Sequence, residues 1–166
     1  MEQFTFTHEG LTFRATIRYD EGMREPWKEH DGHGIVSDWV SRDKRSRERV
    51  LKSDGQWKRY YDFAGSVAIA LKDGWGGEGR TKREKAADAV ERDYKRLKAW
   101  CDDEWYWVYV TVGLLDVEGH AVPGYHESLG GMESDDEEGI KNAAEELAGD
   151  IAARVGDAVR VELQVR

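Results

Sequence analysis

Residues 105–115 constrain the fold of this chain more than any other segment. Their sequence, WYWVYVTVGLL, is almost wholly apolar and rich in aromatic and β-branched side chains. These residue types favour extended backbone, because their side chains pack well on the pleated surface of a sheet. The segment therefore predicts the central strand of a β-sheet.

Shorter periodic patterns predict the elements around this strand. Alternation of apolar and polar residues favours strands, and apolar positions three or four residues apart favour helices. The alternating segments are residues 4–7, 11–19, 49–52, 56–61, 125–129 and 159–165. Helical spacing, with capping residues near the start, predicts helices over residues 62–73, 81–101 and 134–155.

The order of these elements sets the fold class. It shows no regular alternation of strand, helix and strand, so it does not favour a parallel sheet. We expect an α+β fold with a largely antiparallel sheet and three helices covering one face of it. Because the sequence contains no internal repeat and no low-complexity linker, residues 1–166 are expected to form a single domain.

The net charge of −9 is unevenly distributed along the chain. Residues 1–101 carry 21 Lys and Arg against 18 Asp and Glu, a charge of +3, whereas residues 102–166 carry 4 against 16, a charge of −12. An acidic segment of this kind repels nucleic acid and attracts basic protein surfaces, including those that bind DNA phosphates. The alternative interpretation is that the acidic residues serve solubility alone.

The two faces of the central strand predict a binding surface. One set of alternate side chains would face the helices, which leaves Trp105, Trp107 and Tyr109 on a face without helical cover. Exposed aromatic side chains are frequent hot spots of protein interfaces. The alternative is that the loop of residues 20–46 folds over this face. The predicted partner-binding residues are Trp105, Trp107, Tyr109, Asp135, Asp136, Glu137 and Glu138.

A short loop, residues 26–34, concentrates chemically versatile side chains. Its sequence, PWKEHDGHG, contains two of the five histidines, and His30, Asp31 and His33 together suit a Zn, Fe or Mn ion. Three ligands with an open position are typical of a catalytic metal site. The alternative is a structural loop in which these side chains satisfy backbone groups. The residues alone leave both interpretations open.

Residues 42–59 form a basic segment. They include eight Lys and Arg against three Asp and Glu, and Trp57, Tyr60 and Tyr61 lie at its end. Basic and aromatic side chains in one segment can bind phosphates and stack on bases. The alternative is a hairpin whose basic face is solvated and partly paired with the acidic half of the chain.

The glycine-rich residues 74–80 precede a predicted helix, where free backbone N–H groups favour an anion. However, they follow a helix rather than a strand and lack the residue order of a phosphate-binding fingerprint. We therefore expect a flexible connection between two helices.

Neither the cysteine content nor the hydropathy pattern indicates export or membrane insertion. Cys101 is the only cysteine, which excludes an internal disulfide and fits a reducing compartment. No segment reaches the roughly 18 apolar residues needed to span a bilayer, and the first residues do not resemble a signal peptide. We expect a cytoplasmic protein that needs no cofactor.

Three runs of residues resemble a family of small uncharacterised phage and prophage proteins. The runs are PWKEHDGHG at residues 26–34, KRYYDFA through DGWG at residues 58–76, and DEWYWV through LLD at residues 103–116. The resemblance spans most of the chain. It implies a phage-encoded accessory protein that acts in the bacterial cytoplasm, and it offers no catalytic residues to transfer. It also implies inhibition of host defences, because small acidic phage proteins often act in that way.

Together these features predict a non-enzymatic binding protein. Its expected function is to inhibit a host nucleic-acid-handling defence complex, of the CRISPR or restriction type, through an acidic and aromatic surface. The expected partner is a host protein or protein complex, and the aromatic face is also compatible with a homodimer. Two alternatives remain: a metal-dependent hydrolase that uses His30, Asp31 and His33, and an oligonucleotide-binding module that uses the basic hairpin of residues 42–59.

Overall fold

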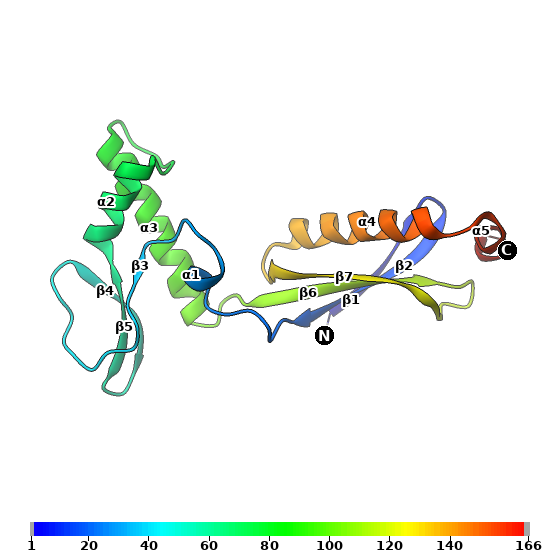
Figure 1. Ribbon diagram of the computed structural model, residues 1–166, viewed down its shortest axis with the longest axis horizontal. Helices are drawn as coiled ribbons and strands as arrows, with labels where there is room; N and C mark the ends of the chain where they lie inside the picture. Colours follow the sequence, from blue (N-terminus) through cyan, green and yellow to red (C-terminus); the bar gives the residue numbers. More distant parts are fainter. Residues whose placement is uncertain (1, 165–166) are drawn as a thin grey trace. The chain divides into compact units, whose positions relative to one another are not determined.

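The computed structural model describes residues 2–164. The chain folds into two compact units. The terminal unit consists of the two ends of the chain, up to Met23 and from Trp105 onward, and the inserted unit consists of Arg24–Glu104. Both units combine helices with antiparallel strands, so the predicted α+β class is confirmed (Figure 1). The expectation of one domain over residues 1–166 stays a prediction.

The terminal unit is built on a four-stranded antiparallel sheet. Its strands, in spatial order, are β1 (Glu2–His8), β2 (Leu11–Tyr19), β6 (Trp107–Leu115) and β7 (Ala121–Glu133). The predicted central strand is confirmed, because β6 pairs with β2 on one side and with β7 on the other. The first hairpin turns at Glu9 and Gly10, whose φ angles of 49° and 75° lie in the left-handed region.

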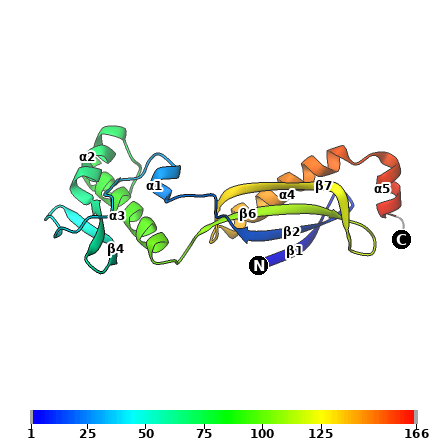
Figure 2. The ribbon, with the colours of Figure 1, turned by 60° about the horizontal axis from the view of Figure 1, so that its bottom comes forward.

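One helix, α4 (Glu137–Arg154), covers one face of this sheet (Figure 2). Its apolar side is composed largely of small residues, which lets the helix approach the strands closely. Ile140 and Ile151 anchor this side, and they pack in one cluster with Phe13 of β2 and Val110 of β6. The outer side of α4 is therefore left to polar and charged residues.

The cap of α4 differs from the expected one. Asp136 accepts a hydrogen bond of 2.9 Å from the backbone N–H of Gly139 and begins the helix. The sequence predicts the cap at Ser134, but the Ser134 hydroxyl accepts a hydrogen bond of 3.0 Å from Tyr106 N instead. Ser134 thus belongs to the end of the sheet, and the helix starts two residues later than expected.

The last element, α5 (Asp157–Gln164), is a helix, whereas the sequence predicts a strand over residues 159–165. Residue 165 lies outside the described residues. The prediction is wrong for the rest because Val159 and Leu163 are four residues apart, a spacing that fits a helix face as well as strand alternation. Both pack against the core of the terminal unit, while Val161 is exposed.

The inserted unit contains a second antiparallel sheet of three strands. In spatial order these are β3 (Ile35–Val36), β5 (Trp57–Asp62) and β4 (Glu48–Asp54). The predicted hairpin is confirmed, because Asp54 pairs with Trp57 across a turn in which Gly55 has a φ of 57°. Its helices are α1 (Pro26–Glu29), α2 (Phe63–Asp73) and α3 (Lys82–Cys101).

Helices α2 and α3 form as predicted. Gly74 ends α2 in the left-handed conformation, with a φ of 69°, and Thr81 and Glu84 form the expected capping box at the start of α3. The two helices pack against each other and against the strands of the inserted unit. Their shared core includes Tyr61 of β5 and Val90 of α3.

The arrangement of helices on strands differs from the expected one. The sequence predicts a single sheet with three helices on one face, whereas the strands form two sheets, and α4 is the main helix on the larger one. Periodicity identifies most of the strands but carries no information about which strands pair. The short strand β3 pairs with β5, within the segment 20–46 that was expected to be a loop.

Candidate functional site

The two tryptophans predicted for partner binding lie in the core. Trp105 is 2% exposed and Trp107 is 4% exposed, and their rings pack edge to face with centroids 5.1 Å apart. The predicted exposed aromatic face is therefore wrong for these two residues, and Tyr109 is also partly buried. Alternation separates the two faces of β6, but it does not show which face is covered, and large indoles gain most from burial.

An exposed aromatic pair does exist at one end of the terminal sheet. Tyr19 and Tyr106 are 59% and 47% exposed, and their ring centroids lie 5.7 Å apart. The sequence pattern places Tyr106 toward the helices. That prediction is wrong because Tyr106 precedes the first residue of β6, where the strand alternation no longer applies.

The predicted acidic residues are on the surface. Asp135, Asp136, Glu137 and Glu138 are all exposed in the turn before α4 and in its first helical turn. The acidic residues continue along the outer side of α4. We call the whole set the acidic face: Asp135, Asp136, Glu137, Glu138, Glu145, Glu146 and Asp150.

Most of the acidic face has no counter-ion among the described residues. Among residues 2–164, the five carboxylates of Glu137, Glu138, Glu145, Glu146 and Asp150 make no hydrogen bond or ion pair. The terminal unit carries 17 Asp and Glu against 6 Lys and Arg, a charge of −11, whereas the inserted unit carries 17 against 19, a charge of +2. The acidic face is thus a concentrated negative surface.

The basic segment of residues 42–59 is largely neutralised by carboxylates of its own unit. Arg42 forms two hydrogen bonds, of 2.7 and 2.8 Å, with the buried Glu48, and these bonds lower the pKa of Glu48 to about 2. Arg47 pairs with Asp62. These guanidinium groups therefore contribute to the fold of the inserted unit.

Other side chains of this segment are also committed to the fold. Arg49 pairs with Glu91 at 2.6 Å and stacks on Phe63, and Arg59 lies between two indole rings. Tyr60 and Tyr61 are fully buried, so the stacking role considered for them is wrong. Trp57 remains exposed at the hairpin turn. The contacts favour the structural interpretation of the basic hairpin.

The loop of residues 26–34, called the histidine loop below, is held by a carboxylate that the sequence does not indicate. Asp93 of α3 lies with Oδ1 2.7 Å from His33 Nδ1, and its Oδ2 accepts hydrogen bonds from Gly34 N at 2.8 Å and from the Tyr61 hydroxyl at 2.7 Å. The Asp93 side chain is 10% exposed. No signal in the sequence connects these groups, because Asp93 is 60 residues away from His33.

The positions of the donor atoms argue against the predicted metal site. Within the described residues, His30, Asp31 and His33 do not converge on one point, and the group of three donor residues that does so is Asp116, Glu118 and His120. Those three lie in the exposed turn between β6 and β7. The metal site predicted at His30, Asp31 and His33 is therefore wrong, because the donor atoms of these three residues do not lie close enough together to share one ion.

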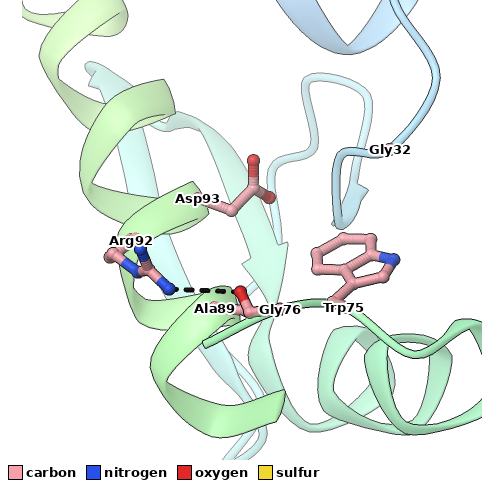
Figure 3. Close-up of a pocket in the computed structure, with 6 residues that line it drawn as sticks. All are labelled: Gly32, Trp75, Gly76, Ala89, Arg92 and Asp93. Carbon is pink, nitrogen blue, oxygen red and sulfur yellow. Dashed lines mark hydrogen bonds between the residues drawn. The ribbon is translucent and has the colours of Figure 1, made fainter. Parts of the chain in front are cut away.

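A pocket of about 360 Å³ lies beside Asp93 (Figure 3). The histidine loop and the glycine-rich loop of residues 74–80 both contribute to its lining, although the sequence singles out these two segments separately. The lining residues are Gly32, Trp75, Gly76, Ala89, Arg92 and Asp93. The glycine-rich loop is held more firmly than the flexible connection that the sequence predicts. Arg92 donates a hydrogen bond of 3.1 Å to the Gly76 carbonyl, and Glu78 N donates one of 2.9 Å to Asp88.

Comparisons with protein-family models, with curated proteins and with solved structures find no match for this chain. Within residues 2–164, none of the helices combines the length and apolar character that a bilayer span requires. The function is therefore inferred from the charges, contacts and cavities of the chain itself.

Proposed function

We propose that the protein is a non-enzymatic binding protein that inhibits a nucleic-acid-handling defence complex of a bacterial host. The acidic face occupies a basic surface on that complex that otherwise binds nucleic acid. The observation that carries this proposal is the row of exposed carboxylates on and before α4, five of which have no partner within the described residues.

The dimensions of α4 support this role. Its 18 residues span about 27 Å at a rise of 1.5 Å per residue. Over a comparable length, a DNA duplex presents phosphates at about 1.7 Å of helix axis per charge. A protein surface that binds a segment of duplex therefore offers basic side chains over a similar distance, and it can pair them with the carboxylates of the acidic face.

The lack of a counter-ion at five of these carboxylates, within residues 2–164, affects the binding energy. An exposed carboxylate that is already paired gives little further energy on binding, because a partner must compete with the existing cation. Among the described residues, Glu137, Glu138, Glu145, Glu146 and Asp150 have no such competitor. Their field also accelerates encounter with a basic surface, an effect that falls as the salt concentration rises.

The contrast between the two units argues against solubility as the only role. The inserted unit has as many acidic residues as the terminal unit, 17 in each, but it pairs many of them with its own 19 Lys and Arg. Solubility alone requires charge of either sign and does not require one sign to accumulate on one helix. The resemblance to phage proteins supports a bacterial host and the cytoplasm as the place of action.

The test uses bacteria that carry an active restriction or CRISPR system. Expression of the protein is expected to raise the plating efficiency of a targeted phage by at least tenfold. The variant neutralises four carboxylates but keeps the helix cap Asp136: Glu138→Gln, Glu145→Gln, Glu146→Gln and Asp150→Asn. It is expected to lose this protection.

A matched control removes the same four negative charges from exposed positions of the inserted unit. Its substitutions are Asp38→Asn, Asp54→Asn, Asp73→Asn and Glu78→Gln. This control is expected to retain protection. Equal loss of protection in both variants, or no protection by the unmodified protein against a panel of such systems, contradicts the proposal.

A further inference from the structure

We propose that the pocket beside Asp93 binds a nucleoside monophosphate. This site lies within the inserted unit and shares no residue with the acidic face, so the inference stands apart from the proposed function. The pocket offers three kinds of contact: an aromatic face, a cationic group, and a fixed carboxylate (Figure 3). A nucleoside monophosphate has one complementary group for each of them.

The hollow of the pocket results from small residues. Gly32, Gly76 and Ala89 supply backbone and a single methyl group, so the space between the larger side chains stays open. A Cβ atom added at Gly76 would meet no heavy atom within 4 Å. The volume of about 360 Å³ is at the low end of the range of about 300–1,000 Å³ for ligand pockets, which suits a mononucleotide better than a larger ligand.

The loop is held in place by the neighbouring glycine. A Cβ at Gly77 would lie 2.0 Å from the carbonyl oxygen of Lys85, so only glycine lets the loop lie this close to α3. Gly77 therefore fixes the position of Trp75 and Gly76 relative to the helix.

Trp75 provides the aromatic face. Its indole stands on the opposite side of the pocket from Arg92, with Gly76 between them (Figure 3). The indole is only partly buried and lines the pocket, where a base can stack on it. Bases of every type stack on such rings, at about 1–3 kcal/mol per base in alanine substitutions, which corresponds to about 5-fold to 150-fold in affinity.

Arg92 provides the cationic group for the phosphate. Its Nη2 donates to the Gly76 carbonyl and lies 3.0 Å from Asp88, but a guanidinium has five N–H donors and its side chain is 59% exposed. The backbone N–H of Gly76 has no acceptor among the described residues. Both groups can donate to phosphate oxygens. The charge of +2 on the inserted unit also favours an anion.

Asp93 provides an acceptor with a fixed orientation. Three donors already hold its two oxygens: His33 Nδ1, Gly34 N and the Tyr61 hydroxyl. A carboxylate has about four acceptor sites, so about one remains for a ligand. A ribose hydroxyl or an exocyclic amine is the matching donor. An anion without such a donor gains nothing from this side of the pocket.

The experiment is a calorimetric titration of the full chain with AMP, adenosine and inorganic phosphate. AMP is expected to bind with a stoichiometry of one, and adenosine to bind at least tenfold more weakly because it lacks the phosphate that Arg92 holds. Inorganic phosphate alone is expected to show no saturable binding. Equal binding of AMP and adenosine contradicts the assignment of Arg92, and the absence of saturable AMP binding at millimolar concentrations overturns the whole proposal.

Variants test the site itself. Gly76→Leu adds a bulky side chain to the lining of the pocket, where an added Cβ atom meets no heavy atom within 4 Å, and is expected to abolish AMP binding at an unchanged melting temperature. Arg92→Gln and Trp75→Leu are expected to weaken binding at least tenfold each. Lys95→Gln removes a charge one helical turn from Arg92 on α3, outside the pocket, and is expected to bind AMP as the unmodified protein does. Undiminished AMP binding by folded Gly76→Leu places the nucleotide elsewhere and overturns the proposal.

Discussion

The hydroxyl of Tyr61 donates a hydrogen bond of 2.7 Å to Oδ2 of Asp93 and thereby connects the sheet of the inserted unit to helix α3. The same carboxylate holds the loop at His33 and Gly34. One buried anion thus ties a strand, a helix and a loop together. Removing any of its donors leaves the carboxylate partly unsatisfied, which is costly in a buried environment.

The Tyr61 contact predicts a pH dependence of stability. Burial, and next the hydrogen bond to Asp93, raise the pKa of Tyr61 above its usual value of about 10. Because the pKa is higher in the folded state, this contribution is fully present below about pH 10 and is lost as the pH rises further. Tyr61→Phe should lower the free energy of unfolding by about 1–3 kcal/mol at pH 7 and flatten its decline above pH 10.

Chemical denaturation between pH 7 and pH 11 checks this prediction. Tyr19→Phe is the control, since Tyr19 is exposed. It should retain the decline of the unmodified protein. An identical alkaline decline in Tyr61→Phe and Tyr19→Phe would show that Tyr61 does not titrate as proposed.

The pair of Arg42 and Glu48 predicts a second pH dependence, on the acid side. Its hydrogen bonds lower the pKa of Glu48 to about 2, below the ordinary value of 4.5. This stabilisation is present above pH 4.5 and is lost as the pH falls from 4.5 toward 2. Glu48→Gln should cost about 1–3 kcal/mol at pH 7 and reduce the acid sensitivity of the inserted unit. Acid titration of tryptophan fluorescence, with the exposed Glu78→Gln as control, measures the difference.

The cap of α4 predicts how two substitutions at one position differ. Asp136→Ala removes the acceptor for Gly139 N and should lower the free energy of unfolding by about 1 kcal/mol. Asp136→Asn keeps an oxygen in the same place and should cost only a few tenths of a kcal/mol, since asparagine is an equally good cap. Thermal unfolding followed by circular dichroism distinguishes them. Equal losses in the two variants would mean that charge, not capping, is the contribution of Asp136.

The burial of Trp107 predicts that its role is in stability. Trp107→Ala should destabilise the protein by about 3–5 kcal/mol, as expected for a large core side chain. Tyr106→Ala, one residue earlier, should stay within about 0.5 kcal/mol because that ring is exposed. Equilibrium unfolding in urea compares the two variants. A smaller loss for Trp107 than for Tyr106 would contradict the assignment of Trp107 to the core.

Local elements were predictable because their causes are local. Alternation, capping residues and the Asp54 and Gly55 turn correctly indicate most strands and the three long helices. The error at α5 has a local cause too, because Val159 and Leu163 satisfy both periods. The pairing of strands into two sheets was not predictable, since it depends on contacts between segments far apart in the chain.

The candidate sites also differ in whether the sequence alone indicates them. The acidic face follows from charges that are adjacent in the sequence, and its exposure is predictable because a run of carboxylates is rarely buried. The Asp93 network depends on β5, α3 and the histidine loop meeting in space, so no spacing indicates it. The burial of Trp105 and Trp107 was missed for a related reason: periodicity separates faces but does not tell which one is covered.

Strands β2 and β6 pair along eight successive positions, from Thr12 with Leu115 to Tyr19 with Val108, in the manner of a hairpin. The inserted unit, Arg24–Glu104, takes the place that a short turn would have in such a hairpin. The terminal unit is thus interrupted in the sequence by a second unit that has its own sheet and its own core. Because the acidic face lies on the terminal unit and the proposed nucleotide site lies on the inserted unit, substitutions can alter either one without touching the core of the other.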